Sequence, residues 1–186
     1  RAKHGDLVVI HDLSVKRTTN GEGNVRDLTY AQLHRLDAGF GEGVPLLEDV
    51  LRHFGHRVLL NIEIKEKGIE REILHLVQNF RLQNGVLISA FDSDDNDSDA
   101  DSSWNQLDVC RGIVPTALLA QESKIMRMGW PAYLEEAIRR GAFAIHPESK
   151  TVYSEAVKVA HGRGRGLLVN TWTVNTPRSI ETFREM

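Results

Sequence analysis

The sequence has little of what marks several broad classes of protein. Cys110 is the only cysteine, so disulfides within the chain and cysteine-based zinc sites are excluded. No apolar run approaches 18 residues and no signal peptide stands at the amino end, so we expect no stable membrane insertion and favour the cytoplasm. The formal net charge is only -3, which gives no general affinity for nucleic acid or anionic membranes.

Length and composition are those of one globular domain. The chain has 186 residues, enough for one sizeable core and too few for two ordinary domains. Hydrophobic residues make up 41% and charged residues 26%, a balance typical of a folded protein. We therefore predict a single domain over residues 1–186.

The period of the apolar pattern switches repeatedly between that of a strand and that of a helix. Strands are predicted at about 7–10, 58–64, 86–90, 113–119, 142–146 and 167–174. Helices are predicted at 28–39, 45–55, 70–85, 131–141, 154–164 and 176–186. This alternation predicts an α/β fold with a parallel sheet.

One low-complexity segment, residues 92–103, carries six acidic residues. Its alternating aspartates suit a calcium-binding loop, but Ala100 and Gln106 stand where such a loop needs Gly and Glu. The alternative is a solvated loop or the frayed start of a helix, and we favour that interpretation.

Residues suited to chemistry gather where the predicted strands end. In parallel α/β proteins, ligands bind at the carboxyl ends of the strands. The residues at these ends are His11 and Asp12, Glu63 and Lys65, Phe91, His146, and Trp172. Packing alone would not load polar residues on one end, so the pattern indicates a site.

The stretch "LLNIEIK" places Asn61, Glu63 and Lys65 on one face of its strand. Three polar side chains fit the inner rim of a closed barrel better than an apolar layer, although a solvated edge strand is the alternative.

Glu63 and Lys65 lie about 6–7 Å apart along such a strand, so both could reach one small anion. The carboxylate would act through a hard cation, Mg²⁺ or Ca²⁺, because the candidate ligands are oxygen atoms and include no cysteine. His11 could act as general acid or base, and together these groups suit phosphoryl transfer.

The sequence resembles the glycerophosphodiester phosphodiesterase family. The resemblance rests on "VVIHDLSVKRTTNGEGNVRDLTYAQLHRLDAG", "VPLLEDVL", "LLNIEIK", "VLISAF", "AIHP" and "VNTWTVNTP", in the family's order and spacing. It implies a TIM-type (β/α)8 barrel, a divalent cation (Mg²⁺ or Ca²⁺), and hydrolysis of small-molecule glycerophosphodiesters to glycerol 3-phosphate and an alcohol. It also implies a small insertion at about residues 13–45.

The resemblance assigns roles to several residues. His11 matches the second of the family's two catalytic histidines, Glu63 a metal ligand, and Lys65 the lysine that faces the phosphate. Trp172 matches the aromatic wall beside the glycerol. Asp12, Phe91 and His146 are further candidates on the substrate side, with Asp12 either orienting His11 or structuring the loop after it.

Other segments of the family pattern have no counterpart in this sequence. These are the His-Arg-Gly strand end, Glu-Asn-Thr, Glu-x-Asp and the last strand. We therefore expect the first strand, most of the second and the eighth to be absent, and the chain alone to be inactive. Unpaired edges would then favour poor solubility or a homo-oligomer. The alternatives are a non-catalytic or truncated relative that keeps the fold, and a lysophospholipase D-like activity.

Overall fold

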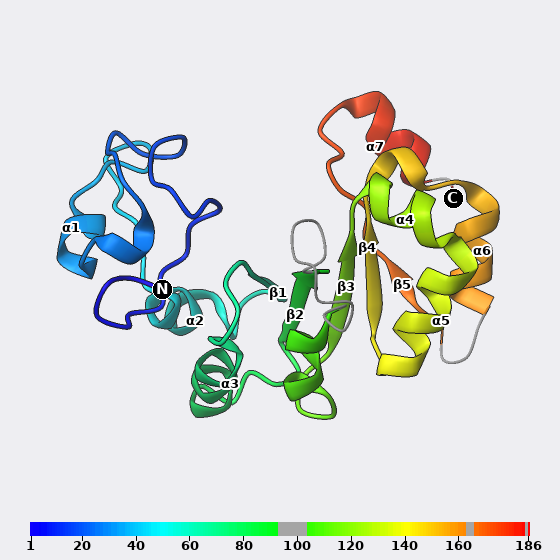
Figure 1. Cartoon of the computed structure of the whole chain (residues 1–186), viewed down its shortest axis with the longest axis horizontal. Helices are drawn as coiled ribbons and strands as arrows, with labels where there is room; N and C mark the ends of the chain where they lie inside the picture. The colour runs from blue at the N-terminus through cyan, green and yellow to red at the C-terminus, as the bar shows by residue number, and fades with distance from the viewer. Residues whose placement is uncertain (93–103, 163–165, 185) are drawn as a thin grey trace. The chain divides into compact units, whose positions relative to one another are not determined.

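The computed structural model describes residues 1–92, 104–162, 166–184 and 186 (Figure 1). Within it the chain forms two compact units, Arg1–Val86 and Leu87–Met186. The prediction of one domain over 1–186 stays a prediction. The acidic segment at 92–103, apart from Asp92, lies outside the described residues, and so does the predicted helix end at Gly164.

The first unit contains η1 (Val25–Asp27), α1 (Tyr30–His34), α2 (Leu47–Phe54), β1 (Leu60–Ile64) and α3 (Glu70–Asn79). Helix α1 begins at a capping box, because the Thr29 side chain accepts from the Gln32 amide while the Gln32 side chain accepts from the Thr29 amide. Acidic residues Glu48 and Asp49 lie in the first turn of α2, where the helix dipole favours them.

Residues 7–10, predicted as a strand, form no strand in this structure. Their backbone groups bond to the start of α2 and the residues before it: Val9 N donates to Pro45 O, and Leu47 N donates to Leu7 O, both at 2.9 Å. Only an isolated antiparallel bridge between Val8 and Leu46 results. Val8 and Ile10 pack, partly buried, against the apolar cluster of the following segment, while Val9 is 44% exposed, so the apolar side chains find partners without forming a strand.

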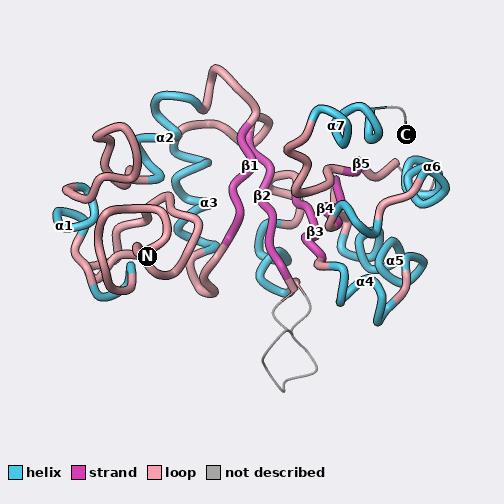
Figure 2. The backbone as a smooth tube through the Cα atoms, turned by 90° about the horizontal axis from the view of Figure 1, so that it is seen from above, coloured by secondary structure: helices cyan, strands magenta, loops and turns pink. Residues whose placement is uncertain are grey.

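The segment predicted as a small insertion, about 13–45, has a core of its own. Its buried apolar side chains are Val15, Val25, Leu33 and Val44, together with Ala2. Figure 2 shows that the chain ahead of α2 is mostly loop, so this core holds together residues with little regular structure. The loop that follows His11 is thereby fixed to a packed cluster.

The second unit is an α/β layer. Strand β2 (Val86–Phe91) begins at the boundary between the units, and β3 (Thr116–Ala120), β4 (Ala144–Pro147) and β5 (Leu168–Val169) follow it in order. The pairs β2–β3, β3–β4 and β4–β5 are all parallel. All five residues of β3 are buried, as expected for a strand covered on both faces.

Helices α4 (Glu122–Met128), α5 (Trp130–Arg140) and α6 (Ser154–Gly162) gather beside β3 and β4 (Figure 1). The remaining elements of this unit are η3 (Asn105–Cys110), η4 (Ser149–Thr151) and α7 (Pro177–Arg184). Helix α5 buries Tyr133, Leu134 and Ala137, and ends at Gly141, whose positive φ of 68° suits glycine.

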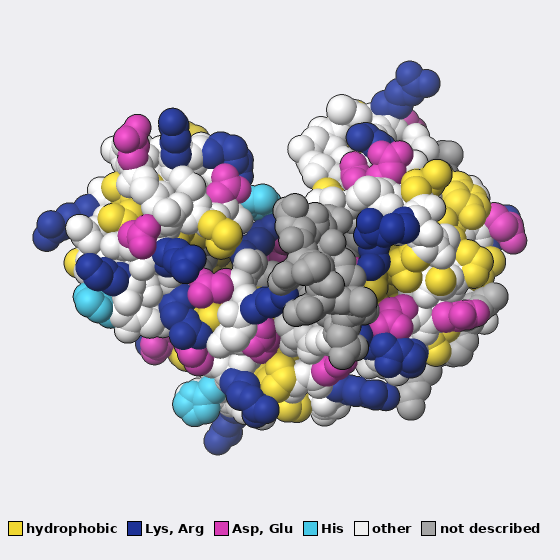
Figure 3. All heavy atoms as spheres, in the orientation of Figure 1, with side chains coloured by type: hydrophobic (Ala, Val, Ile, Leu, Met, Phe, Trp, Pro, Cys, Tyr) yellow, Lys and Arg dark blue, Asp and Glu magenta, His cyan; other side chains and the backbone are white. Residues whose placement is uncertain are grey.

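Most predicted elements are present with shifted ends. Three elements differ more: residues 7–10 form no strand, α4 was not predicted, and the strand expected at 167–174 is a strand only over Leu168–Val169, with an isolated bridge at Trp172. No helix of the described segments combines the length and apolarity needed to cross a membrane. On the face shown in Figure 3, basic and acidic side chains are mixed over both units.

Candidate active site

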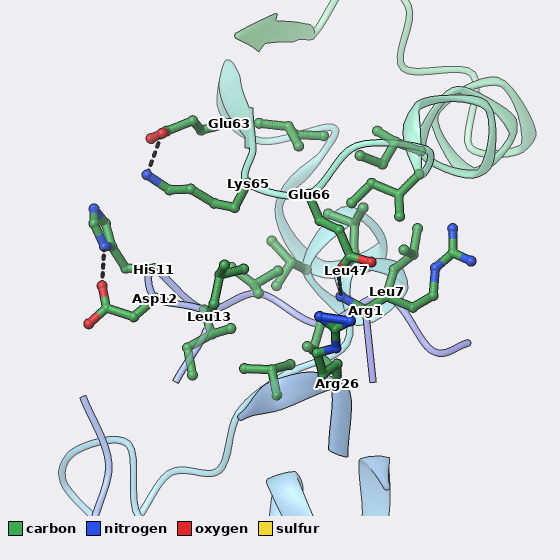
Figure 4. A pocket seen from close by; sticks show the side chains of 18 of the residues that line it. Arg1, Leu7, His11, Asp12, Leu13, Arg26, Leu47, Glu63, Lys65 and Glu66 are labelled. Carbon is green, nitrogen blue, oxygen red and sulfur yellow. Dashed lines mark hydrogen bonds and ion pairs between the residues drawn. The ribbon is translucent and has the colours of Figure 1, made fainter. Parts of the chain in front are cut away.

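A cavity of about 940 Å³ lies in the first unit and contains four of the predicted site residues in its lining: His11, Asp12, Glu63 and Lys65. The strand β1 and the segment at 7–13 supply much of the wall. Figure 4 shows these four side chains pointing to the same side, two from each segment. The structure thus brings together groups that are about 50 residues apart in the sequence.

His11 and Asp12 form a close pair, with Nδ1 of the imidazole 2.6 Å from Oδ1 of the carboxylate. Arg17 binds the same carboxylate with two groups: Nε lies 2.6 Å from Oδ2, and Nη2 lies 2.7 Å from Oδ1. The His11 side chain is 66% exposed and that of Asp12 is 28% exposed. The imidazole is therefore accessible, while the carboxylate behind it is engaged.

The electrostatics of Asp12 follow from these contacts. The hydrogen bond from Arg17 and, next, that from His11 hold the pKa of the Asp12 carboxyl well below its ordinary value of 3.8. Asp12 in turn raises the pKa of the Arg17 guanidinium. Because hydrogen bonds to the charged form stabilise that form, Asp12 is a carboxylate throughout the neutral and mildly acidic range.

Glu63 and Lys65 lie on the same face of the chain at the end of β1, as the alternation predicted. The Lys65 ammonium donates to Oε1 of Glu63, and the two side chains are 27% and 25% exposed. The spacing predicted that both could reach a shared anion, whereas in the structure they pair with each other. An anion that approached Lys65 would compete with this carboxylate.

The described residues do not by themselves fit a complete Mg²⁺ or Ca²⁺ site. Among them there is no group of three or more His, Cys, Asp or Glu side chains arranged to hold a metal ion. Glu63 offers one carboxylate, whereas a hard cation takes six or more oxygen ligands, some from water.

The other predicted site residues, Phe91, His146 and Trp172, lie together in the second unit. The rings of Phe91 and Trp172 meet edge to face, with centroids 5.4 Å apart, and Trp172 Nε1 donates to His146 O at 2.8 Å. His146 is buried, with Nε2 3.0 Å from Nδ2 of Asn170. Burial lowers the pKa of His146 to about 4, so it is neutral near pH 7.

Arg17, which begins the "RTTNG" segment, received no role from the sequence. A signal was present: an arginine follows the His-Asp pair by five residues, across a loop short enough to fold back. Only the tertiary structure shows that the guanidinium meets both oxygens of Asp12.

Comparison with solved structures shows the class of fold. A crystal structure of glycerophosphodiester phosphodiesterase from Thermotoga maritima superposes with a TM-score of 0.75 at 22% identity, covering 98% of this chain and 74% of that one. A phosphodiesterase from Oleispira antarctica, solved in complex with the product sn-glycerol-3-phosphate, gives 0.71 at 19% identity over 99% and 74%. These similarities confirm the predicted α/β fold of the TIM-barrel type.

The sequence then gives the family. The glycerophosphoryl diester phosphodiesterase family matches over residues 2–186. The glycerophosphodiester phosphodiesterase of Caldanaerobacter subterraneus subsp. tengcongensis is 30% identical over 192 residues, covering 96% of this chain and 72% of that protein. The chain belongs to the glycerophosphoryl diester phosphodiesterase family, and the predicted enzyme type, a phosphoric diester hydrolase, is confirmed.

Proposed function

We propose that the protein hydrolyses glycerophosphodiesters to glycerol 3-phosphate and an alcohol, with His11 as the group that moves the proton. The observation that carries this proposal is the exposed imidazole of His11, held through Nδ1 by Asp12 at 2.6 Å beside a cavity. An imidazole fixed at one nitrogen presents the other to a ligand, as proton transfer requires.

His11 would act through Nε2, because Nδ1 faces Asp12. An unprotonated Nε2 can accept the proton of an attacking hydroxyl, and a protonated one can donate to the leaving oxygen. The attacking group can be water or a hydroxyl of the substrate's own glycerol, and both are compatible with this role of His11. Attack by the glycerol hydroxyl would give a cyclic intermediate. Asp12 keeps the ring oriented in both cases, which supports orientation over direct substrate contact for this carboxylate.

Lys65 would stabilise the phosphate. Negative charge increases on the non-bridging oxygens as the phosphorus is attacked, and an ammonium beside them favours that change. Substrate would then replace Glu63 as the partner of Lys65. Glu63 remains our proposed ligand of the divalent cation that the resemblance implies, and the aromatic side chains of Phe91 and Trp172, with His146, remain proposed substrate contacts.

The test is hydrolysis of glycerophosphocholine by the full-length protein, followed by quantifying glycerol 3-phosphate and choline. His11→Ala is expected to lower kcat by roughly 10²–10⁴, the usual contribution of an acid–base group. His4→Ala is the matched control, since His4 is another exposed histidine of the same unit that does not line the cavity. Wild-type turnover in His11→Ala would refute the role given to this residue.

A second substrate separates the proposed activity from the nearest alternative. The cavity wall includes apolar side chains such as Leu7, Val9 and Leu60, which could accept an acyl chain. Release of choline from lysophosphatidylcholine, with little from glycerophosphocholine, would favour a lysophospholipase D-like activity. Equal inertness toward both substrates would favour a relative that keeps only the fold.

A further inference from the structure

The loop after His11 places a third charged group behind the histidine. Arg17 lies five residues beyond Asp12 and does not line the cavity, yet its guanidinium occupies both oxygens of the Asp12 carboxylate. Two parallel N–H···O bonds of this kind fix the plane of a carboxylate as well as its position. The Asp12 carboxylate is therefore fixed by Arg17 while it accepts the hydrogen bond from His11.

The distances determine which nitrogen of His11 carries the proton. Asp12 is a carboxylate and can only accept, so the 2.6 Å contact with Nδ1 requires a hydrogen on Nδ1. Arg17 Nη2 also lies 3.2 Å from Nδ1, but it cannot donate to a nitrogen that is itself a donor. If the proton were on Nε2 instead, Nδ1 and Oδ1 would be two acceptors in contact.

We propose that Arg17 is a positioning residue of the active site: by fixing the Asp12 carboxylate, it keeps the His11 proton on Nδ1 and leaves Nε2 to act on the substrate. This rests on the proposed function of His11. In neutral imidazole either nitrogen can hold the proton, and the hydrogen bond made by one nitrogen decides the form. Without Arg17, Asp12 can rotate away and the constraint on Nδ1 is weakened.

The local fold supports a loop built to hold this arrangement. Val15, between Asp12 and Arg17, is fully buried in the core of the 13–45 segment. Thr19 donates its hydroxyl to Val15 O at 2.8 Å and accepts from Gly21 N at 3.0 Å. Arg17 is therefore anchored on both sides along the chain, although its own side chain is 62% exposed.

The experiment measures the proton position without requiring turnover. Long-range ¹H–¹⁵N correlation spectra of the ¹⁵N-labelled chain at pH 8 distinguish the two neutral forms of each histidine, and His11→Gln identifies the His11 signals. We expect the Nδ1–H form in the wild type and a shift toward the Nε2–H form in Arg17→Gln. Lys16→Gln, which removes a neighbouring exposed cation, is the matched control and should leave the spectrum unchanged.

A conservative variant separates positioning from folding. Arg17→Lys keeps the charge and loses the two-pronged geometry, so it should restore only part of the Nδ1–H form. The amide signals of Val15 and Val25 report whether the loop keeps its core. An unchanged His11 spectrum in Arg17→Gln would overturn the inference, and so would loss of these amide signals in both variants, because Arg17 would then be a residue of the fold alone.

Turnover separates this inference from the function on which it rests. In glycerophosphocholine hydrolysis, Arg17→Gln should lower kcat on the order of 10-fold or more with KM little changed, a part of the contribution expected of His11 itself. If Arg17→Gln shifts the proton while His11→Gln keeps full turnover, the positioning stands and the proposed function fails. If His11→Gln loses turnover and Arg17→Gln leaves the proton in place, the positioning fails alone.

Discussion

The buried histidine of the second unit makes stability depend on pH in a definite direction. Burial lowers the pKa of His146 from its ordinary 6.5 to about 4 in the folded protein. The unfolded chain therefore takes up the proton first as pH falls. The contribution of neutral His146 to the free energy of unfolding is complete above pH 6.5 and is lost progressively as the pH falls toward 4.

The magnitude follows from the two pKa values. Between pH 7.5 and 4.5, the difference in proton uptake at this one group lowers the free energy of unfolding by roughly 2.5 kcal/mol. Nε2 of His146 is 3.0 Å from the Asn170 amide nitrogen, which donates to a neutral imidazole. Protonation would remove that acceptor, so the contact acts in the same direction as burial.

The assay is urea unfolding at both pH values, which lie on either side of the isoelectric point of about 6.3. All three tryptophans, Trp104, Trp130 and Trp172, belong to the second unit, so their fluorescence follows the unit that contains His146. His146→Gln should lose less stability than the wild type between the two pH values, by about that amount. His161→Gln removes an exposed histidine and is the control. Equal pH dependence in the wild type and His146→Gln would refute the reasoning.

Two further outcomes follow from the ion pairs. Arg140 is 6% exposed and donates to Glu136 at 2.6 Å and Asp108 at 2.8 Å, so Arg140→Met should lower the free energy of unfolding by about 3 kcal/mol. Arg139→Met is the control: it removes a 64% exposed partner of Glu136 and should lower the free energy of unfolding by less than about 1 kcal/mol. Urea unfolding measures both variants, and similar losses of stability in the two would contradict this reasoning. If Glu63 is a metal ligand, Glu63→Gln should raise the Mg²⁺ or Ca²⁺ concentration that half-activates hydrolysis; an unchanged activation curve would count against that role.

Local sequence patterns were sufficient to predict most of the helices and the central strands. Short apolar runs predicted β2 and β3, and the stop at Gly141 predicted the end of α5, because these features depend on near neighbours in the chain. Residues 7–10 were misassigned for the same reason. Their composition favours a strand, but whether a strand forms depends on which backbone groups lie beside it.

The sequence by itself determined the family, the α/β class and which residue types follow the predicted strands, since motif order and periodicity depend only on the order of residues in the chain. Only the tertiary structure decided what those residues touch. It paired Lys65 with Glu63 and placed Arg17 behind Asp12. Charged side chains choose partners by distance and direction in space, and these are set by the packing of distant segments rather than by spacing in the sequence.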